Sequence, residues 1–289
     1  MKPAPFEYHA PATVAEAVAS LAELGDEAKV LAGGQSLMPM LALRLARPER
    51  LVDVTRVAEL SGAHRDDGSL VVGATTRHAT LERDPSIGAA VPLLRKAAPY
   101  IGHFQIRNRG TLGGSLAHAD PSAELPAVAR VLDAEFEVSG PGGDRRIPAV
   151  EFFETVFTTT LEPDELLTAV RFPVWGPGSG FAIEEVARRH GDFAIVGALV
   201  AVQVTDGRLE RVAIALTGMG SVPERAEAVE QSLTGSAVAD LDADAVGAQV
   251  VAGLAPPGDV HASPAYRKRV GAALVARALT NAIQETTHA

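Results

Sequence analysis

Two segments of the sequence, residues 32–37 and 111–115, combine a pair of glycines with neighbouring hydroxyl groups. A glycine pair lets the backbone adopt positive φ angles and approach a ligand without a Cβ atom in the way. The backbone amides at the start of a following helix form a concave set of donors for an anion. We therefore predict that the two segments hold a diphosphate group from both sides and that the fold positions a dinucleotide against them.

The elements around the first glycine pair follow the pattern of a strand and then a helix. Residues 30–32 form a short apolar run that predicts a buried strand, and a helix is predicted from about Pro39. Upstream, Thr13 and Glu16 form a capping box at the start of a helix that is expected to end near Gly25. The segment lacks the lysine of a P-loop and the G-x-G-x-x-G spacing, so neither common nucleotide motif explains it.

Further along, the pattern alternates between short strands and helices. Residues 60–77 predict a hairpin that turns at Asp66-Asp67-Gly68. We expect helices at 91–98 and 121–132, and strands at 134–138 and 165–172.

The C-terminal part follows a glycine- and proline-rich linker at 175–180. Asp206-Gly207 is a strong two-residue turn signal, and it predicts a hairpin of strands at 194–204 and 209–216. Helical patterns follow at 224–233 and 240–254. A last helix begins with Ser263 as N-cap and runs to about residue 284. This region therefore predicts a small α+β unit.

The composition excludes several classes of function. The formal net charge of −10 over 289 residues argues against a protein that binds nucleic acid through its phosphates. No apolar stretch approaches the roughly 20 residues that span a bilayer, and residues 1–5 lack the apolar core of a signal peptide, so we expect no membrane insertion and a cytoplasmic protein. The absence of cysteine excludes iron–sulfur clusters held by cysteines of this chain.

Five blocks of the sequence, in order along nearly the whole chain, carry a family resemblance. The blocks are residues 32–39, 102–115, 118–126, 188–194 and 261–267. Together they resemble the FAD-binding medium subunits of the molybdenum hydroxylases, a group that includes the carbon monoxide dehydrogenase medium subunit and the flavin domain of xanthine dehydrogenase. A lone Gly-Gly pair carries little information, whereas five ordered blocks are hard to obtain by chance.

The resemblance implies an α+β fold. We expect a two-lobed FAD-binding domain of the vanillyl-alcohol-oxidase type (PCMH type) at residues 1–175, with lobes of about 1–55 and 56–175. A small α+β domain with an antiparallel sheet and helices, of the carbon monoxide dehydrogenase flavoprotein type, is expected at 181–286.

The resemblance also implies a complex, organised as a dimer of heterotrimers. In such a complex a large molybdopterin subunit oxidises the substrate, and a small subunit with two [2Fe-2S] clusters relays the electrons. FAD on this chain then passes them to a quinone, a cytochrome-linked carrier, NAD or oxygen. Molybdopterin and [2Fe-2S] are expected only on the partner subunits, which fits a chain without cysteine.

Carried over residue by residue, the resemblance assigns a set of cofactor-binding positions. Ile101 and Leu166 are expected to pack against the isoalloxazine ring, and Glu124 to bond its polar edge or the ribityl chain. Phe193 stands where many relatives have a stacked tyrosine; it keeps the stacking face and lacks the hydroxyl group. The full set is Ala32, Gly33, Gly34, Gln35, Ser36, Leu37, Ile101, Thr111, Gly113, Gly114, Ser115, Glu124, Leu166 and Phe193.

Other residues with reactive side chains have weaker patterns. His118 and Asp120 lack a third neighbouring ligand for a metal, and we assign no catalytic residue. Arg107 and Arg109 are candidates for balancing the FAD phosphates, for contacting a partner, or for an ordinary surface position. Residues 267–269, Arg-Lys-Arg, are interpreted as a solvated helix face.

Two other classes of function stay open at this point. The first is a stand-alone FAD-dependent oxidoreductase of the same fold that acts directly on a small organic substrate. The second is a non-catalytic nucleotide-binding module that kept the fold without the chemistry.

Overall fold

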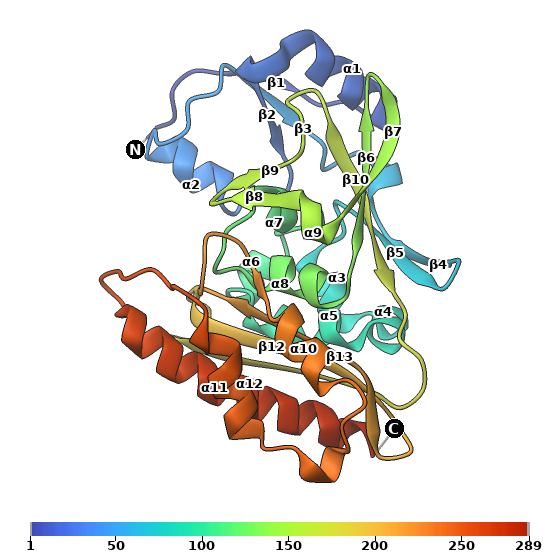
Figure 1. The fold of residues 1–289 in the computed structure, drawn as a ribbon. Helices are drawn as coiled ribbons and strands as arrows, with labels where there is room; N and C mark the ends of the chain where they lie inside the picture. The colour runs from blue at the N-terminus through green and yellow to red at the C-terminus, as the bar shows by residue number, and fades with distance from the viewer. Residues whose placement is uncertain (1, 288–289) are drawn as a thin grey trace.

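The computed structural model describes residues 2–287 of the chain, which Figure 1 shows as an N-terminal lobe, a central lobe and a C-terminal part. The fold is α+β, as predicted. Within the described residues, no helix has both the length and the apolar character that a membrane crossing requires.

The N-terminal lobe is built on a parallel three-stranded sheet of order β1-β3-β2. Helix α1 begins after Thr13, whose hydroxyl accepts a hydrogen bond from the Glu16 amide, and it ends at Gly25 with a φ of 53°. The predicted cap and stop are therefore confirmed. The elements are β1 (Glu7–His9), α1 (Val14–Leu24), η1 (Gly25–Glu27), β2 (Ala28–Leu31), α2 (Leu37–Ala42) and β3 (Arg50–Asp53).

The central lobe holds an antiparallel sheet of order β4-β5-β10-β6-β7, with short helices packed on it. The predicted hairpin turn at Asp66-Asp67-Gly68 is confirmed between β4 and β5. The elements are η2 (Ala58–Leu60), β4 (Ala63–Asp66), β5 (Ser69–Gly73), α3 (His78–Arg83), α4 (Pro85–Ala90), α5 (Pro92–Ala97), η3 (Ala98–Tyr100), α6 (Phe104–Arg107), α7 (Leu112–His118), α8 (Glu124–Val131), β6 (Glu135–Gly140), β7 (Gly143–Pro148), α9 (Ala149–Phe152), β8 (Phe153–Thr155), β9 (Thr158–Thr159) and β10 (Leu166–Pro173).

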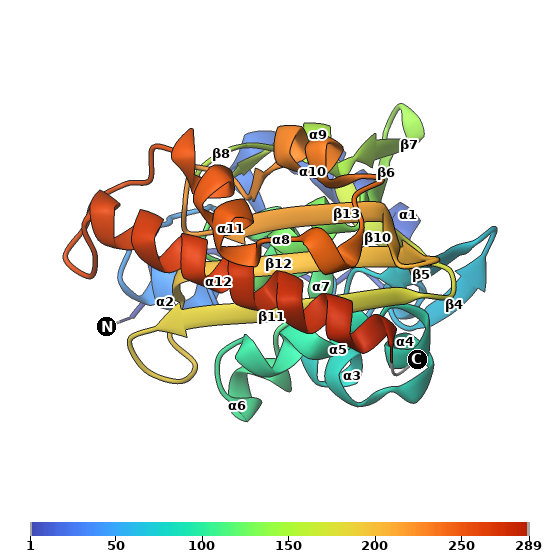
Figure 2. The ribbon, with the colours of Figure 1, turned by 60° about the horizontal axis from the view of Figure 1, so that its bottom comes forward.

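The C-terminal part is an antiparallel sheet of order β11-β12-β13-β14 with α11 and α12 on one face, as Figure 2 shows. The predicted hairpin around Asp206-Gly207 and the last helix with its Ser263 cap are confirmed. The elements are β11 (Ser179–Ala187), β12 (Ala194–Thr205), β13 (Arg208–Thr217), β14 (Glu224–Arg225), α10 (Glu227–Leu233), η4 (Val238–Asp240), α11 (Ala243–Ala252) and α12 (Pro264–Thr286).

The C-terminal sheet is buried on both faces, which explains the continuous apolar run in β12. Leu199 and Ala201 belong to the core of the central lobe, whereas their neighbours Ala198 and Val200 belong to the core under the C-terminal helices. Because side chains alternate along a strand, one sheet closes two cores. The junction between the central lobe and the C-terminal part is therefore a packed hydrophobic interface.

Three predicted helices begin three residues later in the structure than the sequence pattern indicates, and the last of them, predicted from residue 240, begins at Ala243 because Asp242 caps it. The helix predicted from residue 121 begins at Glu124, because the Asp120 carboxylate accepts a hydrogen bond from the Ser122 amide (2.8 Å) and holds a turn there. The helix predicted from residue 224 begins at Glu227, because Glu224 and Arg225 pair with β13 at the sheet edge. In all three places a local or tertiary contact outweighs helical periodicity.

Candidate cofactor site

The two glycine segments lie in direct contact. A Cβ atom added to Gly33 would lie 2.4 Å from the Arg109 carbonyl oxygen and 2.7 Å from the Gly110 Cα. A Cβ added to Gly114 would lie 3.4 Å from the Ala32 Cβ. The absence of a side chain at residue 33 therefore lets two backbones meet and does not make room for a ligand alone.

The first segment presents unused backbone donors. Within residues 2–287, the amides of residues 33–36 donate no hydrogen bond to the protein, and Gly33 itself is buried. Gly34 has a φ of 72°, and the Gln35 side chain donates back to the Gly33 carbonyl (2.9 Å), which braces the turn. Partly buried amides require an acceptor, so this turn is suited to hold an anion.

The second segment differs from the predicted amide site, because its amides bond inside the protein. The amides of residues 112–115 donate to carbonyl oxygens of residues 74, 76 and 111 and to the Thr111 hydroxyl. Gly113-Gly114 lie in the first turn of α7 and make no tight turn after a strand, and Gly113 is buried against Ala74. In the described part of the chain, the Ser115 hydroxyl makes no hydrogen bond, so it is the group this segment leaves for a ligand.

The buried His78 side chain packs against the backbone of residues 110 and 111, at the start of the second segment. Its Nε2 atom lies 2.8 Å from the Thr111 carbonyl oxygen, and a Cβ added to Gly110 would lie 2.8 Å from its Nδ1 atom. Burial lowers the pKa of His78 to about 4, since a charged ring is disfavoured away from water. The imidazole is therefore neutral at physiological pH, and it positions the backbone without adding charge.

Ile101 lies where the central lobe meets the C-terminal part. It is 9% exposed and belongs to the main core. The Arg107 guanidinium donates to the carbonyl oxygens of Ile101 (3.3 Å) and Gly102 (3.0 Å) and forms an ion pair with Glu82 (2.8 Å). Of the three alternatives for Arg107, the structure favours none: its charge is used inside the chain to fix the segment after η3.

Phe193 lies on the loop between β11 and β12 and is 59% exposed. The same loop touches the segment that carries Ile101, because a Cβ on Gly191 would lie 2.7 Å from the His103 ring. The rings of His103 and His190 are 6.0 Å apart. The structure thus brings the loops of Phe193 and Ile101 together, with the Phe193 face open to solvent.

Glu124 and Leu166 are both buried but in different surroundings. Glu124 is 4% exposed at the first residue of α8, and burial, aided by the charge of Asp120, raises its pKa to about 7. Leu166, 4% exposed at the start of β10, belongs to the core cluster of the N-terminal lobe, against which Ala32 packs. Leu166 therefore belongs to the cluster against which Ala32 of the first glycine segment packs, and Glu124 lies at the junction with the C-terminal sheet.

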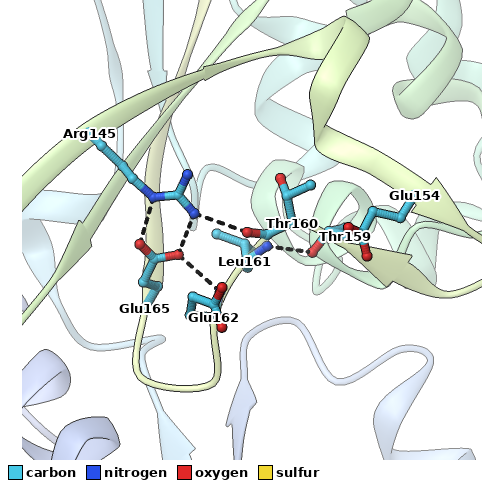
Figure 3. A pocket seen from close by; sticks show the side chains of 7 residues that line it. All are labelled: Arg145, Glu154, Thr159, Thr160, Leu161, Glu162 and Glu165. Carbon is cyan, nitrogen blue, oxygen red and sulfur yellow. Dashed lines mark hydrogen bonds and ion pairs between the residues drawn. The ribbon is translucent and has the colours of Figure 1, made fainter.

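A hollow of about 680 Å³ lies elsewhere, between β7 and the loop before β10 (Figure 3), and none of the predicted site residues lines it. Arg145 and Glu165 are joined there by two hydrogen bonds of 2.6 and 2.7 Å, which neutralise both charges. Among residues 2–287, no group of three or more potential metal ligands is found. The contacts of the glycine segments therefore define the candidate cofactor site better than this hollow does.

Comparison with protein families decides what this arrangement belongs to. The family model "FAD binding domain in molybdopterin dehydrogenase" matches residues 4–175, and "CO dehydrogenase flavoprotein C-terminal domain" matches residues 181–282. The chain belongs to this family of FAD-binding medium subunits. The resemblance inferred from five sequence blocks is thereby confirmed.

Individual relatives of this flavoprotein match along its whole length. The 6-hydroxypseudooxynicotine dehydrogenase complex subunit alpha of Paenarthrobacter nicotinovorans is 42% identical over 98% of this chain and 96% of its own. The carbon monoxide dehydrogenase medium chain of Hydrogenophaga pseudoflava is 38% identical over 98% of both chains. A solved structure of carbon monoxide dehydrogenase from the same organism superposes with a TM-score of 0.95, covering 98% of each chain at 40% identity.

As a member of this family, the flavoprotein is an oxidoreductase subunit whose cofactor is FAD. The residues present fit that cofactor. A pyrophosphate would supply the acceptor oxygens that the amides of residues 33–36 lack, and the Ser36 and Ser115 hydroxyls make no hydrogen bond within residues 2–287. FAD supplies redox chemistry when bound, and the protein supplies binding and orientation.

Glu185, which none of the sequence motifs singles out, lies on β11 across the junction from Glu124. Its strand neighbours on the same face, Phe181 and Ile183, belong to the main core. A signal was present, because Glu185 continues an alternating apolar face of a strand. A carboxylate at such a position is unusual enough to single out.

Replacing Phe193 with tyrosine tests its predicted contact with the flavin. We expect unchanged FAD binding and a reduction potential shifted by about 20 mV, because one added hydrogen bond contributes about 1 kcal/mol. A redox titration measures the shift, with the exposed Phe6→Tyr as the control that should leave the potential unchanged. Identical potentials and oxygen reactivity in Phe193→Tyr and the unaltered protein would remove Phe193 from the site.

Proposed function

We propose that this chain is the FAD-carrying electron-transfer subunit of a molybdenum hydroxylase or dehydrogenase complex. It takes electrons from [2Fe-2S] clusters of a small partner subunit and passes them to an external acceptor, which is a quinone, a cytochrome-linked carrier, NAD or oxygen. A large molybdopterin subunit oxidises the substrate, and the assembly is a dimer of heterotrimers in the cytoplasm.

The observation that carries this proposal is the full-length match to relatives that are themselves named as complex subunits or medium chains. The chain covers 98% of the carbon monoxide dehydrogenase medium chain, so nearly the whole length of that relative has a counterpart here. The sequence has no cysteine. Electrons that arrive through iron–sulfur clusters ligated by cysteine must therefore come from another polypeptide.

In this proposal each predicted site residue binds or orients the cofactor. The half-buried amides of residues 33–36 and the Ser115 hydroxyl hold the pyrophosphate, and Leu166 packs beside the first segment. Ile101 and Phe193 bracket the ring system where two loops meet. The exposed face of Phe193 leaves an edge through which an electron donor or acceptor approaches.

Purification from the native host tests the proposal. We expect the chain to co-purify with a molybdopterin subunit and an iron–sulfur subunit, and its flavin to be reduced when the substrate of the complex is added. Isolation as a single yellow polypeptide whose flavin an organic donor reduces directly would favour the stand-alone oxidoreductase. A colourless protein that does not take up FAD would favour a non-catalytic module.

A further inference from the structure

Glu185 and the start of α8 face each other across the junction of the two domains. In the sheet register Glu185 lies opposite Gly197, which lies opposite Thr217, so the three positions share the face toward the central lobe. The Thr217 hydroxyl donates to the Pro121 carbonyl oxygen (2.7 Å) and lies 3.2 Å from that of Ala123. Glu124 follows Ala123 directly, so this docking places it beside the Glu185 face.

Both carboxyl groups have few of the hydrogen-bond donors that stabilise an ionised carboxylate. The Oε2 atom of Glu185 is buried and has no hydrogen-bond partner. Glu124 is 4% exposed, and its own backbone amide is the donor that its carboxylate meets. Glu184, on the opposite face of β11, contrasts with them because it accepts hydrogen bonds from Arg277 and Asn281. A buried carboxyl without a cation is more stable when it is protonated.

The charged and titratable groups around this pair provide little positive charge. Asp120 precedes α8, and Tyr100 of η3 lies against β11, where its hydroxyl is 3.4 Å from the Ile183 carbonyl oxygen. Arg267 of α12 donates to the Gly218 carbonyl oxygen (3.0 Å), but its charge is paired with Asp259 (2.6 Å). The pair therefore has acids close to it, and the charge of Arg267 is already balanced by its own counter-ion.

We propose that Glu124, which is buried, and Glu185, which is partly buried, form an acid pair that stores a proton at the flavin site and delivers it when the flavin is reduced. This inference rests on the proposed function, because it assumes that FAD lies between the Ile101 and Phe193 loops. Ile101 follows Tyr100, whose hydroxyl contacts Ile183 of β11. Phe193 lies in the loop that joins β11 to β12. The strand that Tyr100 contacts and that leads into the Phe193 loop thus also carries Glu185.

The step balances in protons and electrons. Two electrons from an iron–sulfur donor and two protons convert the oxidised ring to its dihydro form. Glu185 gives up the proton of its carboxyl O–H, an N–H bond forms on the ring, and the second proton comes from water. The carboxylate then recovers a proton from water. Such a store is useful because iron–sulfur clusters deliver electrons without protons.

The titration of the pair agrees with this geometry. Burial, together with the charge of Glu124, raises the pKa of Glu185 from 4.5 to about 8. Because the folded-state pKa lies above the unfolded value, the protonated pair stabilises the fold fully below about pH 4.5, and this stabilisation is lost as the pH rises through about 8.

The first test uses the chain without flavin. We expect the thermal midpoint of the unaltered chain to fall as the pH rises from 4.5 to 8, and Glu185→Gln to show a flatter profile over this window because its amide cannot ionise. Glu184→Gln is the matched control from the same strand, and it should keep the profile of the unaltered chain. A Glu185→Gln profile that coincides with that of the unaltered chain overturns the proposal, whether or not the variant binds FAD.

The second test uses the chain loaded with FAD and mixed rapidly with dithionite at pH values below and above 8. Below this pH we expect the flavin of Glu185→Gln and Glu124→Gln to be reduced more slowly, by about 100-fold, than that of the unaltered chain and Glu184→Gln, because a positioned acid no longer supplies the proton. Equal reduction rates in all four proteins overturn the acid pair while leaving FAD binding intact. Failure of every protein, including the unaltered chain, to bind FAD contradicts the proposed function instead.

Discussion

Replacing Gly33 with valine is expected to lower the affinity for FAD by about 100-fold, because overpacking at a tight contact costs about 3 kcal/mol. The added Cβ would lie 2.4 Å from the Arg109 carbonyl oxygen, and neither backbone can yield as a flexible side chain would. The two segments must separate, and the unused amides of residues 33–36 then lose their alignment with the second segment. Equilibrium titration of the flavin-free variant with FAD, followed by flavin fluorescence, measures the loss.

Gly142 provides the matched control for this variant. It lies in the turn between β6 and β7, and a Cβ added there meets no atom within 4 Å. Gly142→Val should therefore retain FAD with unchanged affinity. If Gly33→Val also binds FAD as tightly as the unaltered chain, the contact between the two segments is not required for the site.

Replacing Arg267 with methionine is expected to destabilise the chain by about 3 kcal/mol, since buried carbonyl oxygens lose a charged donor. Arg267 is 4% exposed, and its guanidinium donates to the carbonyl oxygens of Ile195 and Gly218 and pairs with Asp259. The interpretation of residues 267–269 as a solvated face is therefore wrong at its first position. Chemical denaturation measures the change in the free energy of unfolding.

The neighbouring Arg269 provides a control that separates the effect of losing a positive charge from the effect of losing a buried side chain. It is exposed on the same helix, so Arg269→Met should change the free energy of unfolding by less than about 0.5 kcal/mol. Equal destabilisation by the two substitutions would show that the hydrogen bonds from Arg267 to the carbonyl oxygens of Ile195 and Gly218 add nothing to the free energy of unfolding. Weaker FAD binding in Arg267→Met is a further expected result, because Gly218 in turn bonds the Pro121 carbonyl oxygen that docks α8.

Local signals in the sequence predict local features of the fold reliably. Thr13 and Ser263 cap their helices as expected, because capping depends on residues three positions apart. Asp206-Gly207 turns its hairpin with positive φ at both residues (51° and 73°), a conformation that this pair adopts easily. Each of these features needs only the residues beside it.

The sequence alone does not predict the features that depend on contacts between distant residues. The contact of Gly33 with Arg109 joins two lobes, and the bonding of the amides of residues 112–115 to residues 74 and 76 requires the central sheet to be in place. The burial of Arg267 likewise depends on which face of α12 meets the C-terminal sheet. The residue types of the site were predictable from the family motifs, whereas the partners of each backbone group were not.

The central claim is that a bare-backbone turn at residues 33–36, pressed against the second glycine segment, holds the pyrophosphate of FAD. The most direct measurement compares the affinities of the flavin-free chain for FAD and for FMN, which carries the same ring without the pyrophosphate bridge. We expect one FAD bound per chain and an affinity for FMN lower by about 100-fold, equivalent to about 3 kcal/mol. Equal affinities for FAD and FMN, or no uptake of FAD by a folded preparation, would contradict it.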